Sequence, residues 1–152
     1  MDTVTYPDAA VAREIEGRFV AAKIESGKQP DLARSLGIRW LPGLAVVDAD
    51  GRAASVQTGF LPPEDLLPEL SFGRAIFAMG QKRYDEAHAL FQEVLARPAA
   101  ERAPEAAYWW GISRYRQTKD FKASMKEPWG EIVRRWPRSQ WARKVSWALG
   151  RG

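Results

Sequence analysis

Residues 37–58 constrain the fold of this chain more than any other stretch. Gly37 can end a helix, because a residue without a Cβ readily adopts the left-handed conformation, and Pro42 precedes the continuous apolar run Gly43–Val47. Such a run is typical of a strand covered on both faces. The next four residues, Asp-Ala-Asp-Gly, favour a tight turn, and residues 53–58 have the pattern of a second strand. The stretch therefore predicts the end of a helix, a strand, a hairpin turn and a strand.

The segments on either side of this stretch predict a small α/β unit. A first helix is predicted by Asp8 as its N-cap. Its apolar stripe consists of Val11, Ile15 and Phe19. Residues 20–24 favour a strand and residues 31–36 a short helix, so together with the strand at 43–48 they predict a βαβ unit with parallel strands. Residues 59–65 lead into another helix, which we expect Pro68 to bend or interrupt.

Charge and aromatic content change near Leu70. Residues 1–70 carry 7 Lys and Arg against 11 Asp and Glu, whereas residues 71–152 carry 16 against 8. The net charges of the two segments are therefore −4 and +8, and six of the seven tryptophans lie after residue 100. We accordingly predict two domains, residues 1–70 and residues 71–152.

The second predicted domain has a helical period throughout. An amphipathic helix covers residues 84–96, and another begins at Pro104. Pro128 is expected in the first turn of a new helix, where proline is tolerated. Ser139 is the expected cap of a last short helix that Gly150 closes.

Three segments of the first half are TYPDAAVAREIEGRFVAAKIE, PDLARSLGIRWLPGLAVVDADGR and TGFLPPEDLLPEL. Together they resemble the C-terminal half of the thioredoxin-like family, over roughly residues 3–70. The resemblance implies that the bond between Leu41 and Pro42 is cis, and that Trp40, Leu41 and Pro42 line the groove where the family binds substrates. Alternatively, Trp40 packs at the end of the sheet and Pro42 is an ordinary trans proline.

The chain also departs from this family. Family members carry a first strand and helix, a second strand and a Cys-x-x-Cys helix before the similar segment, whereas this chain starts at Met1 and has no cysteine. We therefore expect a truncated βαββα unit that lacks the strand between its two parallel strands. Either Met1 is an internal methionine of a longer protein, or the two strands pair directly, or a partner chain fills the gap.

The second half resembles tetratricopeptide-like helical hairpins over about residues 71–148. The segment YDEAHALFQEVLARP is similar to the second helix of such a repeat, and AAYWWGISRYRQTKDF to the first helix of the next, with Gly111 as the small packing residue. The resemblance implies all-α hairpins that stack side by side and hold peptides or partner proteins in a groove.

Protein binding without catalysis is the function that these patterns favour. Trp and Tyr are common anchors at interfaces, and the residues proposed for protein-binding helices are Trp109, Trp110, Tyr115 and Trp136. We expect most tryptophans of this half to lie in the core and one or two to be exposed. A homodimer closed through the incomplete sheet is a further expectation.

Other functions have less support in the sequence. Without cysteine the chain has no thiolate nucleophile, and its one histidine, His88, is expected on a helix surface or in a groove. We predict no catalytic residue, metal or cofactor. One alternative is a fragment of a thiol-disulfide oxidoreductase whose Cys-x-x-Cys segment lies upstream. The other is nucleic-acid binding by the basic helices, which is disfavoured because charged helix faces are usually just solvated. The chain has no signal-peptide pattern and no apolar stretch long enough for a membrane span, which predicts a soluble, cytoplasmic protein.

Overall fold

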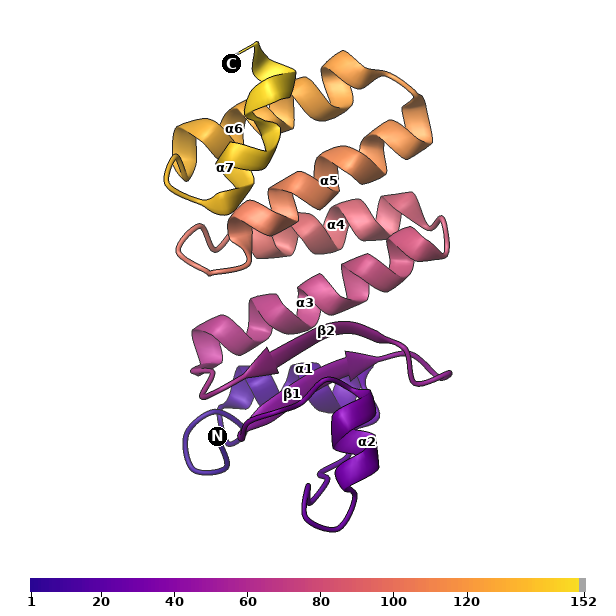
Figure 1. Cartoon of the computed structure of the whole chain (residues 1–152), viewed down its shortest axis with the longest axis vertical. Helices are drawn as coiled ribbons and strands as arrows, with labels where there is room; N and C mark the ends of the chain where they lie inside the picture. The colour runs from indigo at the N-terminus through magenta and orange to yellow at the C-terminus, as the bar shows by residue number, and fades with distance from the viewer. Residues whose placement is uncertain (151–152) are drawn as a thin grey trace. The chain divides into compact units, whose positions relative to one another are not determined.

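The computed structural model describes residues 1–150 and shows a mostly helical chain with one two-stranded antiparallel sheet (Figure 1). The chain divides into two compact units, Met1–Gly73 and Arg74–Gly152. The division falls inside helix α3 (Pro63–Gly80), which contributes residues to both units.

The first unit begins with helix α1 (Ala9–Arg18), which has the predicted cap. The Asp8 carboxylate accepts hydrogen bonds from the amides of Ala10 and Val11 at 2.9 and 3.0 Å. Val11 is fully buried. The short helix α2 (Pro30–Ser35) follows, and its Leu32 is exposed.

The predicted strand at residues 20–24 is absent, so the predicted βαβ unit is wrong. These residues form neither helix nor strand, and within the described chain no backbone hydrogen bond joins them to another segment. Val20 is fully exposed. An apolar pattern alone does not make a strand, because a strand needs a neighbour for its N–H and C=O groups. The alternative in which residues 20–24 pair directly with residues 43–47 is also wrong.

Strands β1 (Gly43–Val47) and β2 (Ala53–Thr58) form the predicted hairpin. The Asp48 carboxylate accepts hydrogen bonds from the amides of Asp50 and Arg52, both at 2.9 Å, and Gly51 has a φ of +78°. Val46 is buried and lies against Gly73 of α3.

Of the bend or interruption expected at Pro68, the interruption does not occur. α3 runs through it without a break for 18 residues. Pro68 is the sixth residue of the helix, so its missing N–H removes a single helical hydrogen bond in the second turn and leaves the rest of the helix unchanged. The buried neighbours Leu66, Glu69 and Leu70 stabilise this turn. Glu69 accepts hydrogen bonds from the side chains of Ser55 and Gln57 on β2.

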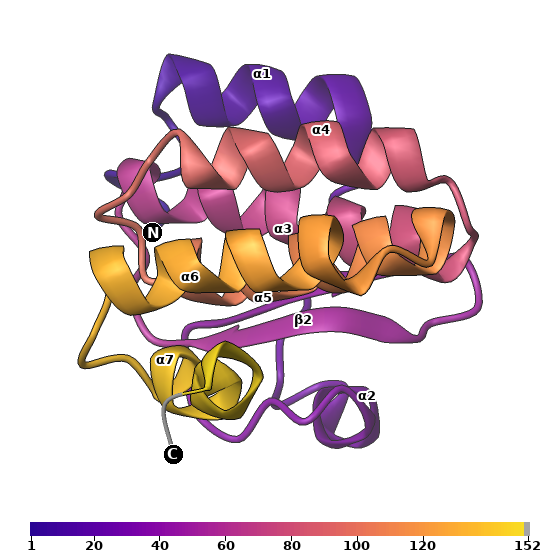
Figure 2. The ribbon, with the colours of Figure 1, turned by 90° about the horizontal axis from the view of Figure 1, so that it is seen from above.

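The second unit continues with α4 (Tyr84–Leu95), α5 (Ala103–Thr118), a π-helical turn (Lys122–Lys126), α6 (Glu127–Arg135), α7 (Gln140–Val145) and a 3-10 turn (Ser146–Leu149). Helices α4, α5 and α6 pack side by side in the order in which they occur in the chain, and α7 packs against α6 (Figures 1 and 2). Pro128 lies in the first turn of α6 and Ser139 caps α7, as predicted.

The C-terminal core of this unit is built around Trp129. Its ring lies parallel to that of Tyr108, with the centroids 5.2 Å apart, and its indole N–H donates to the Tyr108 carbonyl at 3.3 Å. Gly111 leaves room for it, since a Cβ there would stand 2.9 Å from the Trp129 Nε1. The other buried members are Ala107, Met125, Ile132, Ala142 and Val145. The sequence had indicated Gly111 as a packing residue, and this is confirmed.

Candidate protein-binding surfaces

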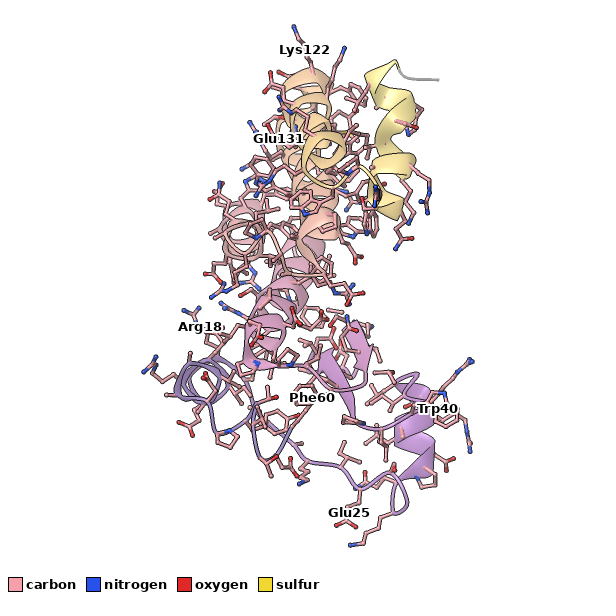
Figure 3. The ribbon with its side chains drawn as sticks, turned by 90° about the vertical axis from the view of Figure 1, so that its left-hand side faces the viewer. Arg18, Glu25, Trp40, Phe60, Lys122 and Glu131 are labelled. Atoms are coloured by element: carbon pink, nitrogen blue, oxygen red, sulfur yellow. The ribbon has the colours of Figure 1, made fainter. Side chains whose placement is uncertain are left out.

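Trp40, Leu41 and Pro42 form an exposed segment immediately before β1. The side chains of Trp40 and Leu41 are 76% and 66% exposed, and the bond between Leu41 and Pro42 is cis, as expected. Trp40 lies at the periphery of its unit (Figure 3). The alternative in which Trp40 packs at the end of the sheet is therefore wrong.

The outer edge of β1 carries unpaired backbone groups. The Gly59 amide donates to the Pro42 carbonyl at 2.7 Å, which makes these two residues a hydrogen-bonded pair of the hairpin. Alternate residues of an antiparallel strand face its neighbour, so Gly43, Ala45 and Val47 direct their N–H and C=O groups to the opposite edge. Within residues 1–150, no third strand lies there.

Apolar side chains are exposed elsewhere in the same unit. Val20 and Ile24 belong to the extended segment without a strand partner, and Phe60 follows β2 (Figure 3). The first unit thus has both free strand edges and uncovered apolar side chains.

The structure does not bring the four aromatic residues predicted in the helical half into one site. Trp109, Trp110 and Trp136 are half-buried, and only Tyr115 of the four is exposed. The Trp136 indole donates to the Pro98 carbonyl at 3.0 Å, and the Arg114 guanidinium lies 5.2 Å from the centre of the Trp110 ring. The Trp109 indole donates to the Glu105 carboxylate at 3.4 Å, so each of these three tryptophans contacts another group of its own unit.

Tyr115 instead belongs to a different group, here called the aromatic patch: Tyr115, Phe121 and Trp147. Phe121 lies 6.3 Å from Tyr115 and 6.3 Å from Trp147, measured between ring centres. Trp147 is 67% exposed, and Tyr115 and Phe121 are each exposed by more than a third. Among the six tryptophans of the second unit, Trp147 alone is exposed, in agreement with the expectation of one or two.

Our site prediction missed Phe121 and Trp147. A signal for Trp147 was present, because the expected apolar stripe of the last helix is Trp141, Val145 and Ala148, and Trp147 lies off that stripe. For Phe121 no comparable signal exists, since it stands where α5 has ended and the π-helical turn begins.

A groove of about 520 Å³ lies between α5 and α6. Its apolar lining includes Trp110 and Val133, and its charged lining includes Arg114, Lys126 and Glu131. Glu131 forms an ion pair with Arg134, so the charges of the groove partly neutralise one another. This mixed lining selects no ligand by its charge.

His88 lies half-buried on α4, close to the expected surface or groove position. Burial lowers its pKa below the ordinary value of 6.5, and the charge of Arg114 acts in the same direction, while Asp85 opposes it. Its Nε2 atom is buried and has no hydrogen-bond partner among residues 1–150. No second histidine exists in the chain, and residues 1–150 contain no group of three or more acidic or histidine side chains placed to hold a metal ion.

Comparison with other proteins assigns neither a family nor a function to this chain. In the described part of the chain, no helix is long and apolar enough to cross a membrane. A scan against protein-family models and searches of curated proteins and of solved structures each found no match to this chain.

Proposed function

We propose that the chain is a protein-interaction module that binds an extended segment of a partner protein along the free edge of β1. The observation that carries this proposal is the exposure of Trp40 and Leu41 next to a strand edge whose N–H and C=O groups are unpaired. Main-chain hydrogen bonds to such an edge supply affinity, and neighbouring side chains supply specificity.

The composition of the edge supports strand addition. Proteins usually protect an edge strand with a charged residue or a proline inside it. The five residues of β1 are Gly, Leu, Ala, Val and Val, so no charge or proline inside the strand opposes pairing. Val47 is exposed at the last position of the strand, and Trp40 and Leu41 are exposed just before the first, so apolar side chains flank the edge at both ends. An extended segment with apolar side chains has the matching chemistry.

The same surface is compatible with the thioredoxin-like resemblance, in which Trp40, Leu41 and Pro42 line a groove for polypeptide substrates. Any thiol chemistry there needs a cysteine from outside this chain, because the chain has none. The proposal therefore concerns binding and assigns no reaction.

The proposal is tested with a displayed library of random peptides selected on the folded chain. The selected peptides are then measured against Ala45→Pro, which removes the outward amide in the middle of β1. The control is Val56→Pro, since Val56 lies directly opposite Ala45 and the same change there blocks only the outer edge of β2. We expect apolar, extended peptides whose binding is lost in Ala45→Pro and kept in Val56→Pro.

Circular dichroism must show that both variants keep the fold, and Trp40→Ala provides a second test that leaves the backbone unchanged. Selected peptides that bind all three variants as well as the parent chain contradict the proposal. If the chain itself is the preferred partner, sedimentation detects a dimer that Ala45→Pro dissociates, which also supports edge pairing.

A further inference from the structure

The aromatic patch lies on the second unit and is separate from the edge of β1. Its three residues come from the last turns of α5, the start of the π-helical turn and the 3-10 turn after α7. Figure 3 shows Lys122, the neighbour of Phe121, projecting into solvent. We propose that this patch is a second docking surface, which binds a negatively charged segment of a partner protein that carries large apolar side chains.

A rigid support holds the patch in place. The Trp129 ring is almost completely buried, and its centre lies 6.5 Å from that of Phe121 and 6.1 Å from that of Trp147. The exposed rings therefore lie on a packed base and lose little conformational freedom when a partner covers them. Large, preorganised aromatic side chains are the usual anchors of protein interfaces.

The charge around the patch defines the partner. The patch residues and their nearest neighbours in sequence, residues 114–127 and 143–147, hold seven Lys and Arg against two acids, Asp120 and Glu127. Lys119 lies 5.9 Å from the centre of the Tyr115 ring, so a cation borders the patch directly. A mainly positive rim beside an apolar centre attracts a partner of the opposite sign. Acidic side chains flanking apolar ones meet both requirements.

The ring geometry favours a protein over a single-stranded nucleic acid. Successive bases stack on exposed aromatic faces, but the planes of Tyr115 and Phe121 are 83° apart, and those of Phe121 and Trp147 are 41° apart. Only Trp147 has most of its surface free. The patch therefore offers an uneven apolar surface for side chains and no row of parallel faces for bases.

The experiment measures fluorescence polarisation of a labelled amphipathic peptide with leucine and phenylalanine on one helical face and glutamate on the other. A peptide of the same composition in scrambled order and a labelled oligo-dT are measured in parallel. The matched variants are Trp147→Ala and Trp40→Ala, which remove the two most exposed tryptophans of the chain. We expect Trp147→Ala to weaken binding of the amphipathic peptide by about tenfold or more, and Trp40→Ala to leave it unchanged.

Raising the salt concentration from about 50 to about 300 mM should also weaken this binding, because it screens the exposed charges. The proposal is overturned if the peptide does not bind, if the scrambled peptide binds equally, or if Trp147→Ala has no effect. Tighter binding of oligo-dT that depends on Trp147 also overturns it, in favour of nucleic acid. The two proposals can fail independently. Strand addition at β1 is tested by changing Ala45 and Trp40, whereas binding at the aromatic patch is tested by changing Trp147.

Discussion

Gly111 and Gly130 lie in neighbouring helices but have opposite surroundings. A Cβ at Gly111 would stand 2.9 Å from the Trp129 Nε1 and 3.0 Å from the Ser124 carbonyl oxygen, whereas a Cβ at Gly130 would meet nothing within 4 Å. Alanine favours a helix over glycine by about 1 kcal/mol, so without a clash both changes would stabilise the protein. The difference between them isolates the packing around Trp129.

We predict that Gly111→Ala lowers the free energy of unfolding by about 1–3 kcal/mol, the usual cost of overpacking a core. Gly130→Ala should raise it by up to about 1 kcal/mol. Chemical denaturation followed by circular dichroism measures both. Equal effects of the two changes would show that Trp129 yields to a methyl group at Gly111.

His88 should make stability depend on pH. Because burial lowers the pKa of the folded imidazole, the unfolded chain binds a proton more readily as pH falls below 6.5. The stability contribution of neutral His88 is therefore complete above pH 6.5 and decreases as pH falls from there toward the folded pKa. Between about pH 7.5 and about pH 5.5, His88→Gln should lose less stability than the parent chain. Parallel denaturation curves at the two pH values test this, and an identical loss in both proteins counts against it.

At the scale of single elements, the two valines at the end of β1 face opposite sides of the sheet. Val46 is buried against Gly73, and its neighbour Val47 is 43% exposed. Val46→Ala should therefore cost about 1–3 kcal/mol of unfolding free energy through lost burial and a residual cavity, and Val47→Ala well under half as much. Urea denaturation of the two variants gives the comparison. A larger effect at Val47 would place the other face of β1 against α3.

Helix α1 depends on its cap. Replacing Asp8 by alanine removes the acceptor of two amide hydrogen bonds, which should cost about 1 kcal/mol. Asp31→Ala is the control, because Asp31 lies in the first turn of α2 and its side chain pairs only with the exposed Arg34. We expect little change in the control. Thermal unfolding of both variants measures the difference. Equal shifts of the melting temperature in the two variants would contradict the prediction.

The elements that local chemistry determines were predictable from the sequence. The turn at Asp48, the caps Asp8 and Ser139 and the close approach at Gly111 each follow from one side chain, or from the lack of one. The strand at residues 20–24 failed because strands depend on distant partners, which no local pattern specifies. Phe121 was missed from the aromatic patch because its exposure depends on where α5 ends and how the chain turns, which is a tertiary property.

At the scale of the whole chain, helix α3 is the element that belongs to both units, because the division between them falls inside it. Its residues Leu66, Leu70 and Phe72 are buried in the first unit, and Ala75, Ala78 and Met79 are buried in the second. A separate second unit that begins at residue 74 therefore starts in the middle of a helix and loses the first turns of α3.

We predict that a fragment of residues 63–152 unfolds cooperatively and at a higher temperature than a fragment of residues 74–152. The longer fragment retains the complete α3, and short helices without their first turns are poorly stable. Circular dichroism melting curves of the two fragments measure the difference. Coincident melting curves would show that residues 63–73 add nothing to the second unit.

The shared helix also restricts how this protein can evolve. An α-helix has 3.6 residues per turn, so inserting or deleting one residue rotates everything beyond it by about 100° relative to everything before it. In a loop such a change is usually tolerated, but between Leu66 and Leu70 of α3 it would turn Leu70 and Gly73 away from the line of Leu66 within the first unit. Substitutions in this helix can accumulate singly, whereas changes of length cannot. We therefore expect relatives of this chain to keep a constant spacing between Leu66 and Gly73, while the turn at Asp48–Gly51 and the segment at residues 19–29 vary in length.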